Sequence, residues 1–127
     1  MRTELVPEGL AAPAANYAHA VLSQHVTRML HTSGVVPTRP DGSVPESLAE
    51  QAETIWGTLS ALLTEADMAP ENVVSVTTYV VVGEDLATVM AARDSALGGH
   101  RAASTLVTVP ALAQAAWRME IAIVATA

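Results

Sequence analysis

The side chains that could do chemistry in this chain stand in four short segments, two near its start and two near its end. The segments are Asn16-Tyr17-Ala18-His19-Ala20-Val21, Thr32-Ser33-Gly34, His100-Arg101-Ala102-Ala103-Ser104-Thr105 and Met119-Glu120-Ile121-Ala122-Ile123-Val124. An arginine can hold a carboxylate through its planar fork, and a glutamate can orient a water or take its proton. Tyrosine and serine hydroxyls can hydrogen-bond a ligand. What the set can do depends on the elements that bring these segments together.

The residue types that are missing exclude several kinds of chemistry. The chain of 127 residues has no cysteine and no lysine, and its formal net charge is −7. It therefore has no disulfide, no thiolate nucleophile, no cysteine metal ligand and no lysine Schiff base. Because the negative charge repels phosphate backbones and aromatic residues make up only 3% of the chain, we expect no nucleic-acid partner.

The histidines do not indicate a metal site. His19, His25, His31 and His100 have no spacing typical of metal ligands, and no carboxylate accompanies them as a catalytic triad would require. We expect no metal. His19 and His31 could instead face a ligand cleft and act as acid or base near neutral pH.

Length and hydropathy predict one globular domain over residues 1–127. Half of the residues are apolar, which is typical of a chain that buries a core. No uninterrupted apolar run is long enough to span a bilayer, so we expect no membrane partner. The N-terminal segment lacks a basic start followed by a long apolar stretch, so we expect a cytoplasmic protein.

Hydrophobic periodicity predicts an α+β fold with the order β-β-α-β-α-β-β. After an irregular lead-in over residues 1–15, we expect strands at 17–24 and 26–36, paired as a hairpin, and strands at 73–82, 102–109 and 117–125. Two helices would cover one face of a mixed sheet.

The two helices have clear apolar stripes. The first stripe runs from Leu48 to Ala66, with a capping box at Ser47 and Glu50 or at Ser43 and Glu46, and Pro70 stops the helix. The second helix ends at Gly98-Gly99. Its stripe consists of Leu86, Val89, Met90, Arg93 and Leu97.

The strand at 73–82 is apolar on both faces. Alternation predicts one face with Val74, Val76, Val80 and Val82 and an opposite face with Val73, Tyr79 and Val81. Two helices can cover only one of these faces, and the other would be an exposed apolar patch on a monomer. We therefore expect a second subunit to cover it.

In order and spacing, the four segments resemble the Rid family of reactive-intermediate deaminases, the YjgF-like proteins, over about residues 13–126. The resemblance implies a chorismate-mutase-like fold, a homotrimer and ligand sites in the clefts between subunits. It also implies hydrolysis of an imine or enamine formed from an amino acid, which yields a 2-oxo acid and ammonia without a cofactor.

Three pocket residues follow from the resemblance near the start of the chain. Tyr17 matches the tyrosine of the family's Pro-Tyr-Ser-Gln-Ala segment, although Asn16 replaces the proline and His19 the glutamine. Ser33 and Gly34 match the family's Ser-Gly-Gln. Val35 stands in place of that glutamine and makes this wall of the pocket more apolar.

The chain departs from the family where the substrate carboxylate is bound. The family's Pro-Ala-Arg-Ser segment has its arginine directly before the serine, and here Ala103 precedes Ser104. Arg101 shares a strand face with Ala103 and could reach the same cleft, or it could be a solvated arginine at a strand start. Met90 stands where the family often has an asparagine, which makes the site less polar.

Glu120 is the candidate catalytic residue, and two registers remain open for it. Counting from Ser104 places Glu120 at the catalytic glutamate of the family's Val-Glu-Ile-Glu-Ala-Ile-Ala strand, whereas matching large and small side chains places Ala122 there. Both positions share one face of a strand. Glu120 could otherwise be a solvent-facing carboxylate paired with Arg118.

Three functions are compatible with these residues. The first is a Rid-like hydrolase of imines or enamines. The second is a divergent Rid-like protein without that activity, whose pocket with Val35, Met90 and Ala103 binds or transforms a less charged small molecule. The third is a trimeric scaffold without a ligand.

Overall fold

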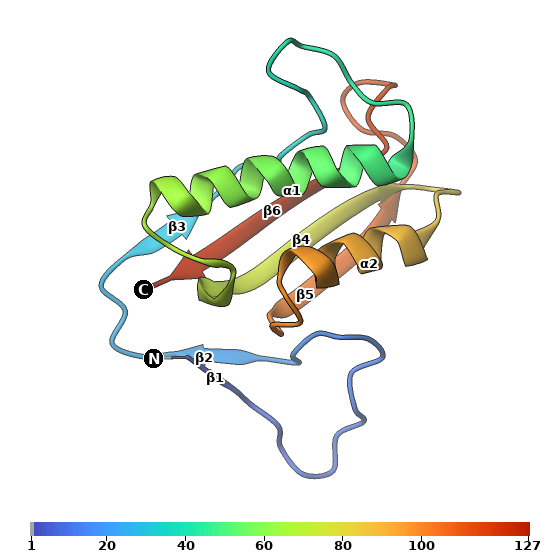
Figure 1. The fold of residues 1–127 in the computed structure, drawn as a ribbon. Helices are drawn as coiled ribbons and strands as arrows, with labels where there is room; N and C mark the ends of the chain where they lie inside the picture. Colours follow the sequence, from blue (N-terminus) through green and yellow to red (C-terminus); the bar gives the residue numbers. More distant parts are fainter. Residues whose placement is uncertain (1) are drawn as a thin grey trace.

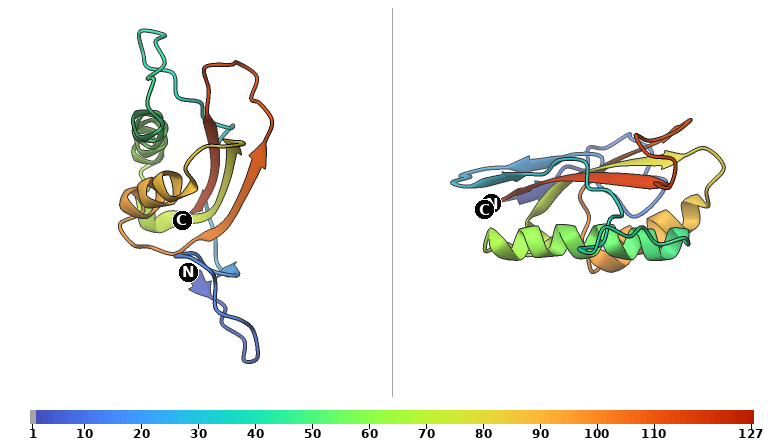
Figure 2. Two further views of the ribbon diagram at one scale, coloured as in Figure 1. Left: turned by 90° about the vertical axis from the view of Figure 1, so that its right-hand side faces the viewer. Right: turned by 90° about the horizontal axis from the view of Figure 1, so that it is seen from above.

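The computed structural model describes residues 2–127 and consists of a mixed four-stranded sheet with two helices on one face (Figure 1, Figure 2). The sheet has the order β3-β6-β4-β5. Its strands are β3 (Met29–His31), β4 (Val73–Val81), β5 (Ala103–Val109) and β6 (Met119–Thr126). β4 and β5 are parallel and the other neighbours are antiparallel, so the predicted mixed sheet is confirmed.

The helices are α1 (Leu48–Glu65) and α2 (Leu86–Ala96), and a 3-10 turn, η1 (Pro70–Asn72), lies between α1 and β4. Ser47 caps α1, because its hydroxyl accepts the amide of Glu50 at 3.1 Å. The stripe residues Ile55 and Leu59 are fully buried in one core with Ile121 and Ile123 of β6. Both helices therefore lie where their apolar periodicity predicted.

The predicted hairpin of strands 17–24 and 26–36 is wrong. β2 (Val21–Ser23) pairs with β1 (Arg2–Glu4) in a separate two-stranded sheet, and β3 pairs with β6. His25, with φ of 57°, turns the chain between them, and the amides of Thr27 and Arg28 then bond the carbonyl of Ala127 at 2.9 and 3.0 Å. The lead-in over residues 1–15 is likewise not irregular throughout, because Arg2–Glu4 is a strand; Met1 lies outside the described residues.

A bulge corrects the predicted faces of β4. The register with β6 shifts between Val73 and Ser75, so Val74 is the extra residue. Val73 therefore joins Val76 and Val80 on the buried face under the helices, although alternation had placed it opposite them.

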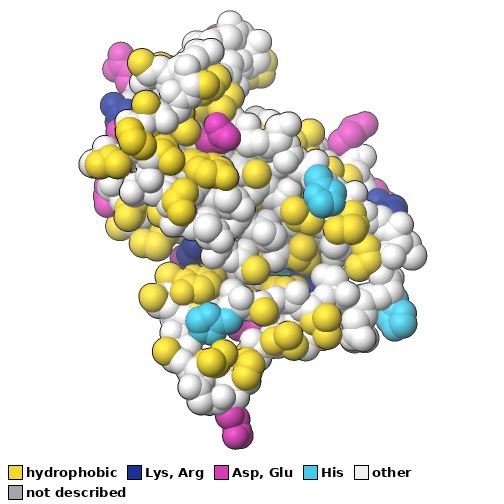
Figure 3. All heavy atoms as spheres, turned by 180° about the vertical axis from the view of Figure 1, so that it is seen from behind, with side chains coloured by type: hydrophobic (Ala, Val, Ile, Leu, Met, Phe, Trp, Pro, Cys, Tyr) yellow, Lys and Arg dark blue, Asp and Glu magenta, His cyan; other side chains and the backbone are white. Residues whose placement is uncertain are grey.

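The face of the sheet opposite the helices is uncovered, and we call it the open face. Hydrophobic side chains are spread over it in the view from behind (Figure 3). Met29 of β3 and Val107 of β5 are exposed on this face, while Tyr79 of β4 is half-buried there.

Candidate functional site

A pocket of about 370 Å³ lies at the outer edge of β5, and we call it the edge pocket. It contains three of the residues predicted from sequence: Tyr17, Met90 and Ser104. Its other lining residues are Ala15, Arg93, Thr105 and Leu106.

The pairing of β5 with β4 shows on which face of the sheet each lining residue of β5 lies. Ser104 lies opposite Val76, on the helix side of the sheet, whereas Thr105 lies opposite Thr77, on the open face. Residues from both faces of this edge strand line the pocket, which therefore lies at the edge of the strand.

Arg93 also lines this pocket, although from the sequence it was predicted only as part of a helix stripe. It is 6% exposed, on the buried side of α2 with Val89. Its Nη1 donates to Ser104 Oγ at 3.2 Å, and its Nε and Nη2 both donate to Asp94 Oδ1, at 3.2 and 3.1 Å. A charged residue on an otherwise apolar helix stripe is the sequence signal that could have identified it.

Tyr17 is held at the pocket by its backbone. The amide of Ala18 donates to the carbonyl of Ala102 at 3.0 Å, and Ala18 forms a parallel bridge with Ala103. The Tyr17 hydroxyl accepts the amide of Ala14 at 3.3 Å. Ala18 thus adds a single bridge to the outer edge of β5 at its start, directly after Tyr17.

Arg101 lies apart from the edge pocket. Its Nη2 donates to the carbonyl of Tyr17 at 2.7 Å and pairs with Glu4 at 3.1 Å. It lines a smaller pocket of about 170 Å³, formed largely by residues 4–13 and also lined by His19. Arg101 therefore supports the backbone of Tyr17 and ties β1 to the sheet.

Glu120 and Gly34 lie together on the open face. Val35 and Ile121 exchange backbone hydrogen bonds of 2.7 and 3.1 Å, which brings residue 34 beside β6. A Cβ atom added to Gly34 would lie 2.6 Å from the carboxyl carbon of Glu120 and would overlap this group. The exposed Ser33 directly precedes this contact.

The Glu120 carboxylate has no hydrogen-bond or ion-pair partner within residues 2–127. The predicted alternative, a pair with Arg118, is wrong because Arg118 Nε instead faces Glu84 Oε1 at 3.6 Å. Glu120 is half-buried and lies opposite Tyr79 of β4. Its carboxylate is thus positioned by packing and free to accept a hydrogen bond from a ligand or a water.

Within one chain the edge pocket is separate from the pair formed by Glu120 and Gly34. β4 lies between β6 and β5, which places the two strands about 10 Å apart. Along the strands, Glu120 aligns through Tyr79 with Val107, three residues beyond Ser104. Ala103, half-buried opposite Ser75, faces the open side with Glu120, whereas Ser104 faces the helices.

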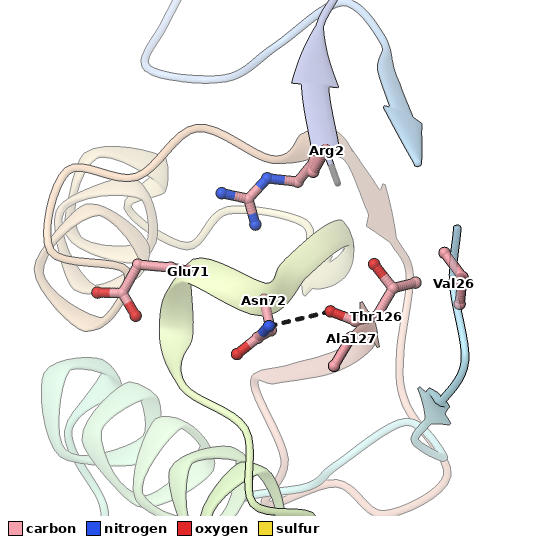
Figure 4. Close-up of a pocket in the computed structure, with 6 residues that line it drawn as sticks. All are labelled: Arg2, Val26, Glu71, Asn72, Thr126 and Ala127. Atoms are coloured by element: carbon pink, nitrogen blue, oxygen red, sulfur yellow. Dashed lines mark hydrogen bonds between the residues drawn. The ribbon is translucent and has the colours of Figure 1, made fainter. Parts of the chain in front are cut away.

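A further pocket of about 330 Å³ lies between β1, η1 and the C-terminus (Figure 4). Asn72 Nδ2 donates to the carbonyl of Thr126 there at 3.0 Å. Burial lowers the pKa of the Arg2 guanidinium, and the nearby Glu71 carboxylate opposes this shift. This pocket contains none of the residues predicted from sequence.

Residues 2–127 contain no group of three or more His, Cys, Asp or Glu side chains placed to hold a metal ion. No helix in that range is both long and apolar enough to cross a membrane.

The sequence model of the endoribonuclease L-PSP family matches residues 9–127. No curated protein matches the chain. Among solved structures, YyfB from Yersinia pestis, described as a protein of unknown function of the conserved Rid protein family, is 29% identical with a TM-score of 0.87, over 99% of this chain and 98% of that one. Yeast YEO7 is 26% identical with a TM-score of 0.73, over 99% and 98%. Escherichia coli TdcF with bound serine shares the fold at 21% identity, with a TM-score of 0.72 over 94% and 91%.

Proposed function

The chain belongs to the endoribonuclease L-PSP family, the family of the Rid (YjgF) proteins, and from this membership we propose that it hydrolyses small imine or enamine intermediates and releases ammonia. The observation that best supports this activity is the Glu120 carboxylate, packed against Gly34 and left without a protein partner in residues 2–127. Such a carboxylate can orient a water and accept its proton.

The reaction requires only a positioned water and proton transfers. Water adds to the carbon of the protonated imine while Glu120 takes one of the water's protons, which gives a neutral carbinolamine. Glu120 returns this proton to the amine nitrogen, the C–N bond breaks and ammonia leaves. The hydroxyl proton is then lost to water, which leaves the carbonyl of the product. Holding the substrate beside the water supplies the remaining rate enhancement.

We place the site between two chains of a homotrimer. The edge pocket and the Glu120–Gly34 group are too far apart in one chain to contact one small substrate together. An apolar open face on one chain, packed against the β5 edge of the next, would bring the two groups into one cleft. Each cleft would then take Tyr17, Met90 and Ser104 from one chain and Glu120, Ser33 and Gly34 from its neighbour.

The ligand class that suits this cleft is a small amino-acid derivative. TdcF binds serine, a small molecule with a carboxylate, within the same fold. The present chain differs from the family motif at Ala103, and in this respect we regard it as a divergent member. An alanine offers no group to hold a carboxylate, so another residue must do so if the substrate is an amino-acid imine.

An RNA substrate does not suit the chain, although the family is named after an endoribonuclease. A net charge of −7 without any lysine opposes the approach of a phosphate backbone.

The second candidate is a divergent protein without amino-acid imine deaminase activity, which binds or transforms a less charged small molecule. Met90 in the edge pocket and Ala103 beside it favour this candidate, because neither side chain offers a charge or a strong hydrogen-bonding group.

An imine-decay assay tests the proposed function. An amino-acid oxidase generates 2-iminopropanoate in place, and its disappearance is followed with and without the protein. We expect the wild-type trimer to accelerate the decay and Glu120→Gln, which keeps the shape and removes the base, to lose about a hundredfold or more of the enzymatic rate. No acceleration by a folded wild-type trimer would refute the deaminase activity and favour the second candidate.

A further inference from the structure

We propose that Arg93, on α2, holds the substrate carboxylate in place of the arginine that is absent at position 103. This assignment deepens the proposed function and depends on it. Arg93 supplies a positive charge from α2, on the helix side of the edge pocket, whereas β5 carries the uncharged Ala103.

The guanidinium of Arg93 retains donors for a ligand. Three of its five N–H groups bond to Asp94 and Ser104, which leaves one free N–H on each terminal nitrogen within the described structure. Each of these donors can bond a carboxylate oxygen. The Ser104 hydroxyl accepts from Arg93, so its own proton can be donated to the same ligand.

Arg93 is the only charged residue among the lining residues of the edge pocket. The Asp94 carboxylate, which pairs with Arg93 Nη2 at 3.1 Å, lies outside this lining and is 40% exposed. The Arg93 side chain itself is 7% exposed, and low exposure to water strengthens its hydrogen bonds. Asp94 and Ser104 fix the plane of the guanidinium, so little conformational entropy is lost when a ligand binds.

Arg101, the other arginine near the β5 start, differs from Arg93 in its position, since both arginines pair with a carboxylate. It pairs with Glu4 and donates to the carbonyl of Tyr17, and it lines a different pocket. Arg93 instead shares its pocket with Tyr17 and Ser104.

The apolar lining residues of the edge pocket indicate which side chain the substrate carries. Met90 lies one turn before Arg93 on α2, and Leu106 follows Ser104 on the same face of β5. Both are apolar, so a carboxylate on Arg93 directs an apolar substituent toward them. The substrate class is a 2-imino acid with an apolar side chain.

Benzoate and benzamide are matched probes, because they share a shape and differ in charge. We expect the wild-type protein to bind benzoate more tightly than benzamide in calorimetry. Arg93→Gln should weaken benzoate binding by about tenfold to a hundredfold and change benzamide binding much less. Arg93→Lys should retain part of the preference, because it keeps the charge and loses the fork.

Two further variants complete the comparison. Arg39→Gln removes an exposed arginine that pairs with Glu50, and it should leave both affinities unchanged. If Arg101→Gln abolishes the preference for benzoate and Arg93→Gln does not, the assignment is overturned.

The wild-type protein provides a test that does not depend on the folding of a variant. On addition of benzoate, the nitrogen-15 NMR signal of Arg93 Nε, identified by its absence in Arg93→Lys, should shift, whereas benzamide should leave it in place. An unchanged signal at saturating benzoate would overturn the assignment.

Failure of this inference and failure of the proposed function give different results. Benzoate binding through Arg93 without acceleration of imine decay would support the carboxylate site and refute the hydrolysis. Imine decay that is equally fast with Arg93→Gln would support the hydrolysis and overturn the role of Arg93. A wild-type protein that prefers benzamide would overturn the assignment and favour the less charged ligand.

Discussion

The Glu120 side chain fills the space beside Gly34, so a side chain at position 34 would displace the Glu120 carboxylate. No positive φ requires a glycine there, so the constraint is the space that the Glu120 carboxylate occupies. Both residues are site candidates by family resemblance. Their contact cannot be predicted from the sequence, because position 34 reaches β6 only through the Val35–Ile121 bridge.

Gly34→Ala should therefore displace the Glu120 carboxylate while the fold persists. We expect the imine-decay rate to fall by about tenfold to a hundredfold, because small misplacements of a catalytic group are costly. Gly57→Ala is the matched control: Gly57 lies exposed in α1 with no atom within 4 Å of an added Cβ. It should keep the rate and raise the free energy of unfolding by about 0.5–1 kcal/mol. An unchanged rate in Gly34→Ala would show that this contact does not position the base.

The site could be predicted only in part at the level of single residues. Tyr17, Met90 and Ser104 do share a pocket, and the absence of an arginine at 103 is visible in the sequence. Arg93 could not be singled out, because its place near Ser104 depends on how α2 packs against β5. The separation of Glu120 from that pocket likewise follows from the strand order, which is a tertiary property.

Among the elements, β1 is tied to the start of β5 by the Glu4–Arg101 ion pair, whose side chains are 31% and 37% exposed. A double-mutant cycle with Glu4→Gln and Arg101→Gln should give a coupling energy of about 0.5–1 kcal/mol, as expected for a partly exposed pair. The measurement is denaturant unfolding of the four proteins at one protein concentration. Strictly additive effects would mean that the pair does not hold β1.

The helices and the longer strands could be predicted because local patterns determine them. α1 and α2 end within one residue of their apolar stripes, and Ser47 is one of the two predicted caps. The pairing of the short strands could not be predicted. β3 pairs with β6, which is distant in sequence, and β2 pairs with β1, which lies in a segment without alternation. The bulge at Val74 also escaped prediction, since it interrupts the period of two on which the face assignment rested.

For the whole molecule, we propose that each cleft takes residues from two chains of a homotrimer. The open face of one chain and the edge pocket of the next are then two halves of one site. In a homotrimer made only of one variant, every cleft carries the same defect. Met90→Trp should fill the edge pocket, and Glu120→Gln should remove the base, so each protein alone should be inactive.

The most direct measurement is the imine-decay rate of mixed trimers that contain Met90→Trp and Glu120→Gln chains in equal amounts, prepared by co-expression. A cleft is intact when its edge pocket comes from a Glu120→Gln chain and its Glu120 comes from a Met90→Trp chain. Random assembly gives this combination in about a quarter of the clefts, so we predict about a quarter of the wild-type rate. The control is the same two proteins purified separately and combined without subunit exchange. A mixed trimer no more active than this control would refute a cleft shared between two chains.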